Sequence, residues 1–221
     1  MSLFAALNSP VGRKALTGVT GIGLVLFVIA HMAGNLSYLF GSDAYNLYAH
    51  KLMSLGALFY GIEVLLAICF LLHAYLGIVI TIRNRRARPQ GYKKYRSAGR
   101  PSRLTASSRT MIMTGVIILI FLVLHLKSFK FGTYYTVEIN GVEMRDLYRL
   151  MEEKFQDPLY AFGYPMVMIL LGLHLRHGVW SAFQSLTLTS RKLSAALYPL
   201  GLILGIGVAI GFIVVPLYIY F

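Results

Sequence analysis

Residues 15–36 read ALTGVTGIGLVLFVIAHMAGNL, a largely apolar run in which His31 is the one ionisable side chain. A helix of this length, at ~1.5 Å per residue, covers the ~30 Å hydrocarbon core of a bilayer. Further apolar runs follow along the chain, and each is long enough to span a membrane. We therefore expect an all-α integral membrane protein, a single membrane domain over residues 1–221 built as a bundle of five transmembrane helices. The expected helices cover residues 14–39, 53–82, 107–129, 159–187 and 195–218.

The composition agrees with a membrane protein. Hydrophobic residues make up 57% of the chain and charged residues 13%, whereas soluble domains carry roughly 25% charged residues. The single cysteine, Cys69, excludes an internal disulfide. The first apolar stretch shows no small-residue cleavage site and is followed by more spans, so we expect a retained helix and not a signal peptide.

The net charge of +13 is concentrated in one connection. Residues 83–106 are rich in Arg and Lys and contain no acidic residue, which the positive-inside rule interprets as a basic cytoplasmic loop. The outer loop, residues 130–158, then lies on the other side, with the N-terminus cytoplasmic and the C-terminus outside. A nucleic-acid partner, which such a charge would suggest in a soluble protein, is not expected. Two further basic pairs fall on the cytoplasmic side: Arg13 with Lys14 and Arg191 with Lys192.

The outer loop has predicted structure of its own. Residues 136–144 alternate around Asn140 and Gly141, which is typical of a β-hairpin. Residues 146–155 have the pattern of a short amphipathic helix. We expect both to cover the outer end of the bundle. At the opposite end, Ser107 or Ser108 is expected to cap the third span.

The chain has six histidines, and five of them fall inside expected spans. Ionisable side chains are costly in hydrocarbon, so they indicate functional sites. A single membrane histidine could instead form a hydrogen bond between helices, but here four spans each hold at least one. The six are His31, His50, His73, His125, His174 and His177. His50 lies between the first two spans and is expected at the interface.

The depths of the histidines predict two pairs. His31 lies ~25 Å and His125 ~24 Å from the inner surface, whereas His73 and His177 each lie ~15 Å from it. Two histidines facing each other supply both axial nitrogens of a haem iron, and bundle cores commonly house such cofactors. Zinc would need all its ligands at one metal, which a ~10 Å difference in depth disfavours. The fourth span offers two candidate ligands, His174 and His177, three residues apart on nearly one face. Depth favours His177, and His174 is then expected to bind a propionate or a quinone.

Other polar residues in the spans are candidates for the same chemistry. Glu63 is the one acidic residue inside a span, ~15 Å outward from His73. Our hypothesis is that it transfers the quinone proton, and the alternative is a structural carboxylate in an ion pair. Several basic residues are candidates for binding haem propionates or quinone, unless they only extend to the interface. These are Arg13, Lys14, Arg109 and Arg176 on the inner side and Lys127 and Lys130 on the outer side.

A series of short motifs runs through the chain in order. They are SPVGRK (9–14), HMAGN (31–35), NRRARP (84–89), SRT (108–110), HLKSFKFG (125–132), DLY (146–148), GLHLRHG (172–178) and WSAFQ (180–184). As a series they resemble the dihaem cytochrome b membrane-anchor subunit of succinate dehydrogenases and fumarate reductases. The resemblance implies that His31 and His125 hold a distal haem b, and that His73 and His177 hold a proximal one.

The resemblance also implies a place in an oxidoreductase complex of a bacterial cytoplasmic (inner) membrane. A cytoplasmic flavoprotein subunit with covalent FAD and an iron–sulfur subunit would act on succinate or fumarate, with the basic loop docking the latter. Electrons would pass through the two haems to or from menaquinone. Leu175 stands where some fumarate reductases carry a glutamate that moves protons. Two alternatives remain: a dihaem subunit of a nitrate reductase or hydrogenase, and a haem-free proton-coupled transporter.

Overall fold

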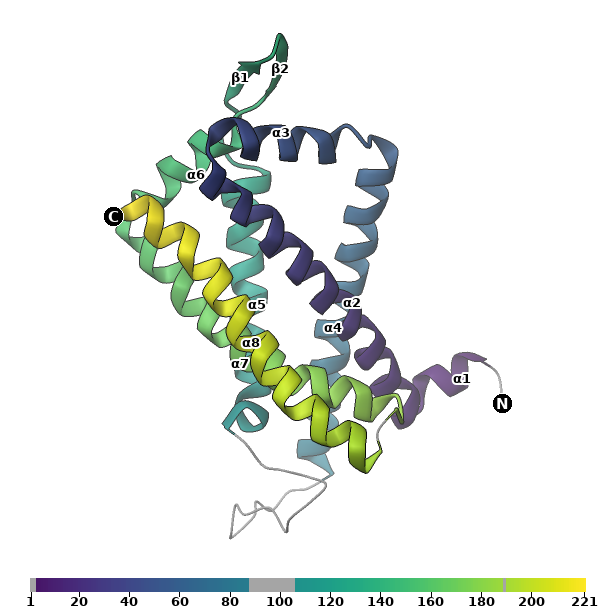
Figure 1. Ribbon diagram of the computed structural model, residues 1–221. Helices are drawn as coiled ribbons and strands as arrows, with labels where there is room; N and C mark the ends of the chain where they lie inside the picture. The colour runs from purple at the N-terminus through teal and green to yellow at the C-terminus, as the bar shows by residue number, and fades with distance from the viewer. Residues whose placement is uncertain (1–2, 88–105, 189) are drawn as a thin grey trace.

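The computed structural model describes residues 3–87, 106–188 and 190–221 of the chain (Figure 1). Within these residues, five helices are long and apolar enough to cross a membrane, which confirms the all-α membrane class and the five expected spans. The spanning helices are α2 (Pro10–Leu36), α4 (Ala57–Arg86), α5 (Ala106–His125), α7 (Pro158–Ser185) and α8 (Arg191–Tyr220). Of the expected basic loop, residues 88–105 lie outside the described residues.

The chain begins its spans at residues that suit helix starts. Ser9 accepts a hydrogen bond from the Gly12 amide at 3.0 Å, and Pro10 takes the first helical position of α2. Asp157 caps α7 in the same way, at 2.8 Å from the Leu159 amide. At the other end of the first span, the one-turn helix η1 (Ser37–Phe40) extends α2.

Two short helices lie where the sequence predicted none: α1 (Leu3–Asn8) and α3 (Ser42–Met53). Helix α3 is too polar to be found as a span. The chain turns into it at Gly41, with φ +98°, and out of it at Gly56, with φ +56°, a region that favours glycine. The second span therefore starts at Ala57, four residues later than predicted, because α3 occupies the residues before it.

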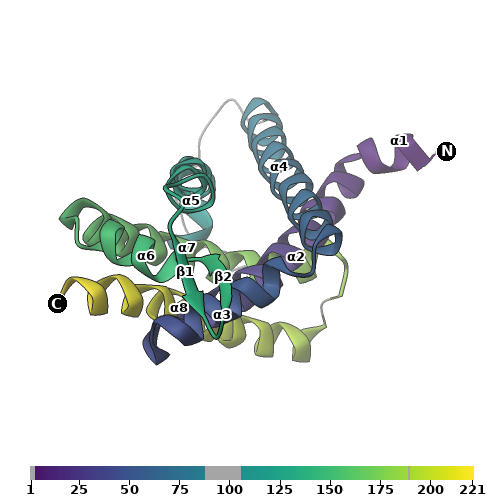
Figure 2. The same ribbon diagram turned by 90° about the horizontal axis from the view of Figure 1, so that it is seen from above.

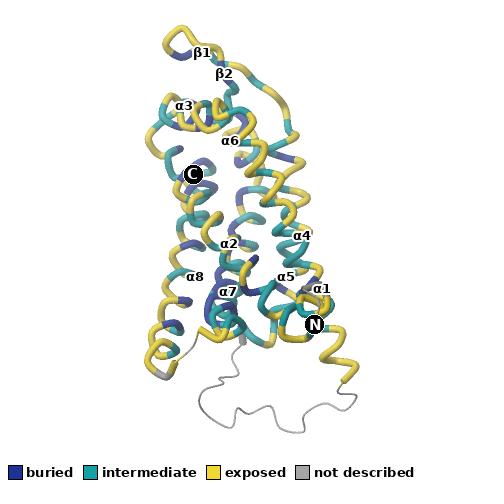
Figure 3. Tube along the Cα trace, turned by 90° about the vertical axis from the view of Figure 1, so that its right-hand side faces the viewer, coloured by how far each residue is buried: buried dark blue, intermediate teal, exposed yellow. Residues whose placement is uncertain are grey.

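Helices α7 and α8 form the tightest pair in the bundle (Figures 1 and 2). A Cβ atom on Gly172 would lie 2.6 Å from the Gly205 carbonyl oxygen, and one on Gly201 would lie 2.7 Å from the Arg176 carbonyl oxygen. Small residues let membrane helices approach this closely. Helix α2 packs on both α7 and α4, and α5 packs on α7. Exposed positions run along α4, whose one buried residue is Leu76 (Figure 3).

The predicted hairpin and amphipathic helix are confirmed. Strands β1 (Thr136–Ile139) and β2 (Val142–Arg145) pair antiparallel about Asn140 and Gly141, which have φ of 54° and 76°, and α6 (Leu147–Phe155) follows. We call this the hairpin end of the bundle, and the end at which α1 lies the N-terminal end. The two termini lie at opposite ends (Figure 1).

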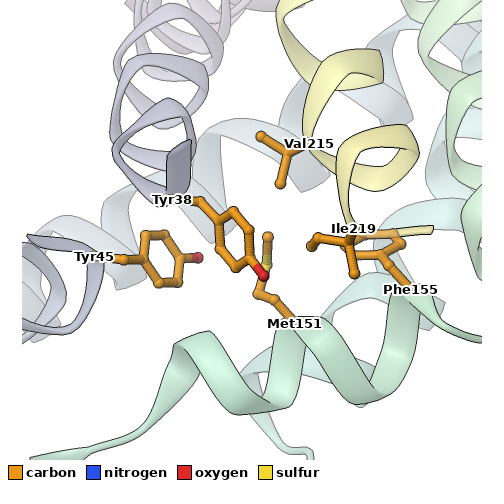
Figure 4. Packing of buried hydrophobic residues seen from close by; sticks show 6 residues of the cluster. All are labelled: Tyr38, Tyr45, Met151, Phe155, Val215 and Ile219. Carbon is orange, nitrogen blue, oxygen red and sulfur yellow. The ribbon is translucent and has the colours of Figure 1, made fainter. Parts of the chain in front are cut away.

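A buried apolar cluster closes the hairpin end (Figure 4). It joins η1 and α3 to α6 and the last turns of α8, and its members are Tyr38, Tyr45, Met151, Phe155, Val215 and Ile219. Asn46, 1% exposed, adds polar contacts to this junction. Its side-chain oxygen accepts from the Leu147 and Tyr148 amides at 3.0 Å each, and its side-chain nitrogen donates to Asp146 at 2.9 Å.

Candidate functional site

His31 on α2 and His125 on α5 face each other across the bundle. Their ring centroids lie 5.8 Å apart, and the ring planes are nearly perpendicular, at 84°. We call these two residues the first pair. Aromatic rings surround them, with Phe27 stacked on His31 at 5.4 Å and Phe121 stacked on His125 at 5.7 Å. Three more aromatic side chains complete this environment: Phe129, Tyr164 and Phe212.

His73 on α4 and His174 on α7 form the second pair, nearer to the N-terminal end. Their ring centroids are 6.4 Å apart, with an angle of 68° between the planes. In the first pair, the printed polar contact is that of His31 Nε2, which lies 3.4 Å from Asn35 Nδ2 on the same helix. In the second pair, both rings have polar partners on neighbouring helices through Nδ1. The His73 Nδ1 atom lies 3.2 Å from the Thr17 carbonyl oxygen, and the His174 Nδ1 atom lies 3.1 Å from the Thr114 Oγ1 atom.

The partner of His73 is thus His174, whereas the sequence pointed to His177. The His177 ring instead lies 6.1 Å from the Trp180 ring. The prediction compared depths, which placed His174 only one turn away. Depth does not define how a helix is rotated about its axis. Three residues turn an α-helix by about 300°, so the side chains of His174 and His177 point about 60° apart around α7. That rotation, and not the depth, brings His174 opposite His73.

The hydrogen bonds of the second pair define which ring nitrogen carries the proton. A carbonyl oxygen only accepts, so His73 donates from Nδ1 to Thr17. The Thr114 hydroxyl donates to the Thr110 and Met111 carbonyls, 3.1 Å from each, so its oxygen accepts from His174 Nδ1. Both rings then present an unprotonated Nε2, the form that binds a metal, with the other nitrogen held by a neighbour.

The distances within both pairs fit two imidazoles on one iron. Metal–nitrogen bonds of about 2 Å, with about 1 Å more from each nitrogen to its ring centre, separate the centroids of two opposed ligands by about 6 Å. The pairs measure 5.8 Å and 6.4 Å. Buried His125 Nδ1 has no hydrogen-bond partner among the described residues. A haem needs only two protein ligands, and no three of the described His, Cys, Asp or Glu residues cluster for a metal ion.

Glycines lie against the rings of the second pair. A Cβ atom on Gly21 would lie 3.2 Å from His73 Cε1, and one on Gly115 would lie 3.5 Å from His174 Cε1. A longer side chain at either position would push on the imidazole that it touches. Both glycines therefore leave room for the imidazole rings of the second pair.

Glu63 forms an ion pair with Lys130, the last residue of the π-helical turn η2 (Leu126–Lys130) that follows His125. The Lys130 ammonium also lies 5.3 Å from the Phe59 ring centre and 5.9 Å from that of Tyr60. Side chains of the ion pair are about one-third exposed. The structural alternative for Glu63, an ion-paired carboxylate, is therefore present at the hairpin end.

The remaining basic candidates do not meet at one place. Arg13 is half-buried in the first turns of α2, where its guanidinium donates to the Asn8 carbonyl. Arg176 is half-buried, with its backbone against Gly201 of α8. The exposed ones are Lys14, Arg109 and Lys127. His50 lies on α3, outside both pairs.

The threonines that hold the second pair were not predicted from the sequence. Thr20 Oγ1 lies 3.3 Å from His73 Nδ1, and Thr114 holds His174. Both are buried hydroxyls inside apolar spans, a signal that could have identified them. Comparison of the chain with protein-family models, with curated proteins and with solved structures finds no significant match.

Proposed function

We propose that this chain is a dihaem cytochrome b that carries electrons across a bacterial cytoplasmic membrane. The strongest support is the arrangement of four histidines, one from each of four spanning helices. They form two facing pairs, and the distance between the ring centroids in each pair suits two imidazoles on one haem iron. When bound, a haem b with two imidazole ligands supplies one-electron transfer, because no iron position is open to oxygen or substrate.

The protein's own residues bind and orient under this proposal. The Thr17 carbonyl and the Thr114 hydroxyl hold the second-pair rings with Nε2 free. The aromatic rings around the first pair exclude water from the other haem site. The two pairs lie at different depths, which supports a path for electrons along the bundle axis.

We assign the N-terminal end to the cytoplasm. Arg83, Arg85 and Arg86 lie in the last turn of α4 at this end, and Arg13 and Lys14 lie at the start of α2. This concentration of positive charge supports a cytoplasmic location. The second pair would then hold the proximal haem and the first pair the distal haem.

The proposed complex is a succinate dehydrogenase or fumarate reductase. The motifs that run through the chain support this choice over a nitrate reductase or hydrogenase. An iron–sulfur subunit would dock at the basic cytoplasmic surface and exchange electrons with the proximal haem, and a flavoprotein would bind the dicarboxylate. Menaquinone would react at the hairpin end, where Glu63 is available to exchange a proton once its ion pair with Lys130 opens.

Alanine substitutions in each pair test the proposal. We expect His31→Ala to remove one of two haems b and His73→Ala to remove the other, each seen as the loss of a different step in a redox-titrated optical spectrum. His50→Ala is the matched control, since His50 is a histidine outside both pairs, and it should keep both steps. A haem-free wild type with normal folding would instead indicate a transporter or a bare anchor.

A further inference from the structure

Ser107, in the first turn of α5, has a buried hydroxyl with no partner. Its side chain is 2% exposed, and its Oγ atom has no hydrogen bond among the described residues. Helix α5 is described from Ala106, so Ser107 and Ser108 both lie inside it, whereas the sequence predicted one of these two serines as the N-cap. A buried hydroxyl that makes no hydrogen bond is costly. Its presence therefore needs a reason outside the packing of α5.

The register of α5 relates Ser107 to the second pair. Ser107 precedes Thr114 by seven residues, and Thr114 contacts His174. Seven residues make nearly two full helical turns, so both side chains lie on one face of α5, about 10 Å apart along its axis. Ser107 therefore lies on the face that contacts the second pair, displaced from it toward the N-terminal end.

Helix α2 repeats this relationship on the other side of the pair. Thr20 contacts His73, and Arg13 precedes Thr20 by seven residues on the same face. Helices α2 and α5 both run from the N-terminal end toward the hairpin end (Figure 1). Helix α2 thus carries Arg13 and α5 carries Ser107. Each of these donors lies two turns before the threonine that contacts a histidine of the second pair, on the side of the N-terminal end.

We propose that Ser107 on α5 and Arg13 on α2 bind the propionate carboxylates of the haem held by His73 and His174. This inference rests on the proposed function. A haem carries two propionates on one edge, and carboxylates accept hydrogen bonds from hydroxyl and guanidinium groups. The two donors define the direction of that edge, toward the N-terminal end of the bundle.

The test compares Ser107→Ala with Ser108→Ala and Ser107→Thr. A propionate that loses its donor places more negative charge near the iron, which favours the ferric state. We expect Ser107→Ala to keep both haems and to lower one midpoint potential, the one that disappears in His73→Ala. Ser107→Thr, which keeps the hydroxyl, should restore the potential. Ser108→Ala removes a hydroxyl that points about 100° away and should leave both potentials unchanged.

Stability of the haem-free and haem-loaded forms gives a second readout. Without haem, Ser107→Ala removes a hydroxyl that has no partner, so the melting temperature should be unchanged or higher. With haem, it removes a bond to a propionate, and the melting temperature should fall. Unchanged midpoint potentials, or an equal fall of the melting temperature in the haem-free and haem-loaded forms, would overturn the role of Ser107. If the protein still holds two haems, the proposed function would remain supported. A wild type without haem overturns both.

Discussion

The Nδ1 atom of His174 lies 3.1 Å from the Oγ1 atom of Thr114, and the same hydroxyl is committed to two backbone carbonyls of its own helix. A threonine in this arrangement accepts from the ring and does not donate to it. The orientation and the protonation of His174 therefore depend on a neighbouring helix. This gives α5 a role in the second pair, although α5 supplies neither of its rings.

Removing that hydroxyl should weaken binding at the second pair. Thr114→Val keeps the side-chain shape and leaves His174 Nδ1–H without its acceptor. Loss of such a partner typically lowers metal affinity roughly 10- to 100-fold. We expect a corresponding loss of haem affinity at the second pair, measured by haem titration of the apoprotein. Thr81→Val is the control, since Thr81 donates to the Gly77 carbonyl on α4; an equal loss there would argue against a specific role for Thr114.

The two histidines of α7 should behave differently. His174→Ala removes a ring that faces His73 and should cost one haem per chain. His177→Ala removes a ring that lies against Trp180 and should leave both haems in place. Haem content of the purified variants decides between the two residues, and the reverse result would restore His177 as the ligand.

Asn46 should stabilise the hairpin end. Asn46→Ala removes three hydrogen bonds from a side chain that is 1% exposed and leaves the first amides of α6 without their acceptor. We expect a loss of roughly 2–4 kcal/mol, since a buried group left unsatisfied costs about 1–3 kcal/mol. Thermal unfolding in detergent, with proteolysis of the hairpin, measures the change. The exposed Ser42→Ala on the same helix should change stability by less than about 0.5 kcal/mol.

Glu63 should affect quinone turnover without affecting haem content. Glu63→Gln keeps the size of the side chain but removes the charge that pairs with Lys130 and the capacity to exchange a proton. We expect slower menaquinol turnover with both haems retained. Lys130→Met separates the two roles, because it breaks the ion pair and leaves the carboxyl in place. Turnover that is unchanged in Glu63→Gln would leave the carboxylate with a structural role alone.

The spans and the outer hairpin could be predicted because each depends on local properties of the chain. The length of an apolar run predicts a membrane span. An Asn-Gly pair between two segments of alternating apolar and polar residues predicts a hairpin. Helix α3 could not be predicted in this way. Its burial depends on Tyr45 and Asn46 meeting α6, which is distant in the sequence.

The candidate site, too, could be predicted in part from local properties, while the rest depends on contacts between helices. The matched depths of His31 and His125 could be counted from the charged ends of their helices, and the structure brings these rings together. The choice between His174 and His177 depends on how α7 is rotated, which the close glycine contacts with α8 help to define. Such contacts join backbone atoms of two helices, so the residue pattern of one helix alone does not predict them.

If the four paired histidines hold two haems, the haem content of the purified wild-type protein will show it. A pyridine haemochrome assay, calibrated against protein concentration, should give two haems b per chain. One haem per chain would mean that one of the two pairs does not bind iron. A folded protein with no haem would mean that neither pair of histidines binds iron.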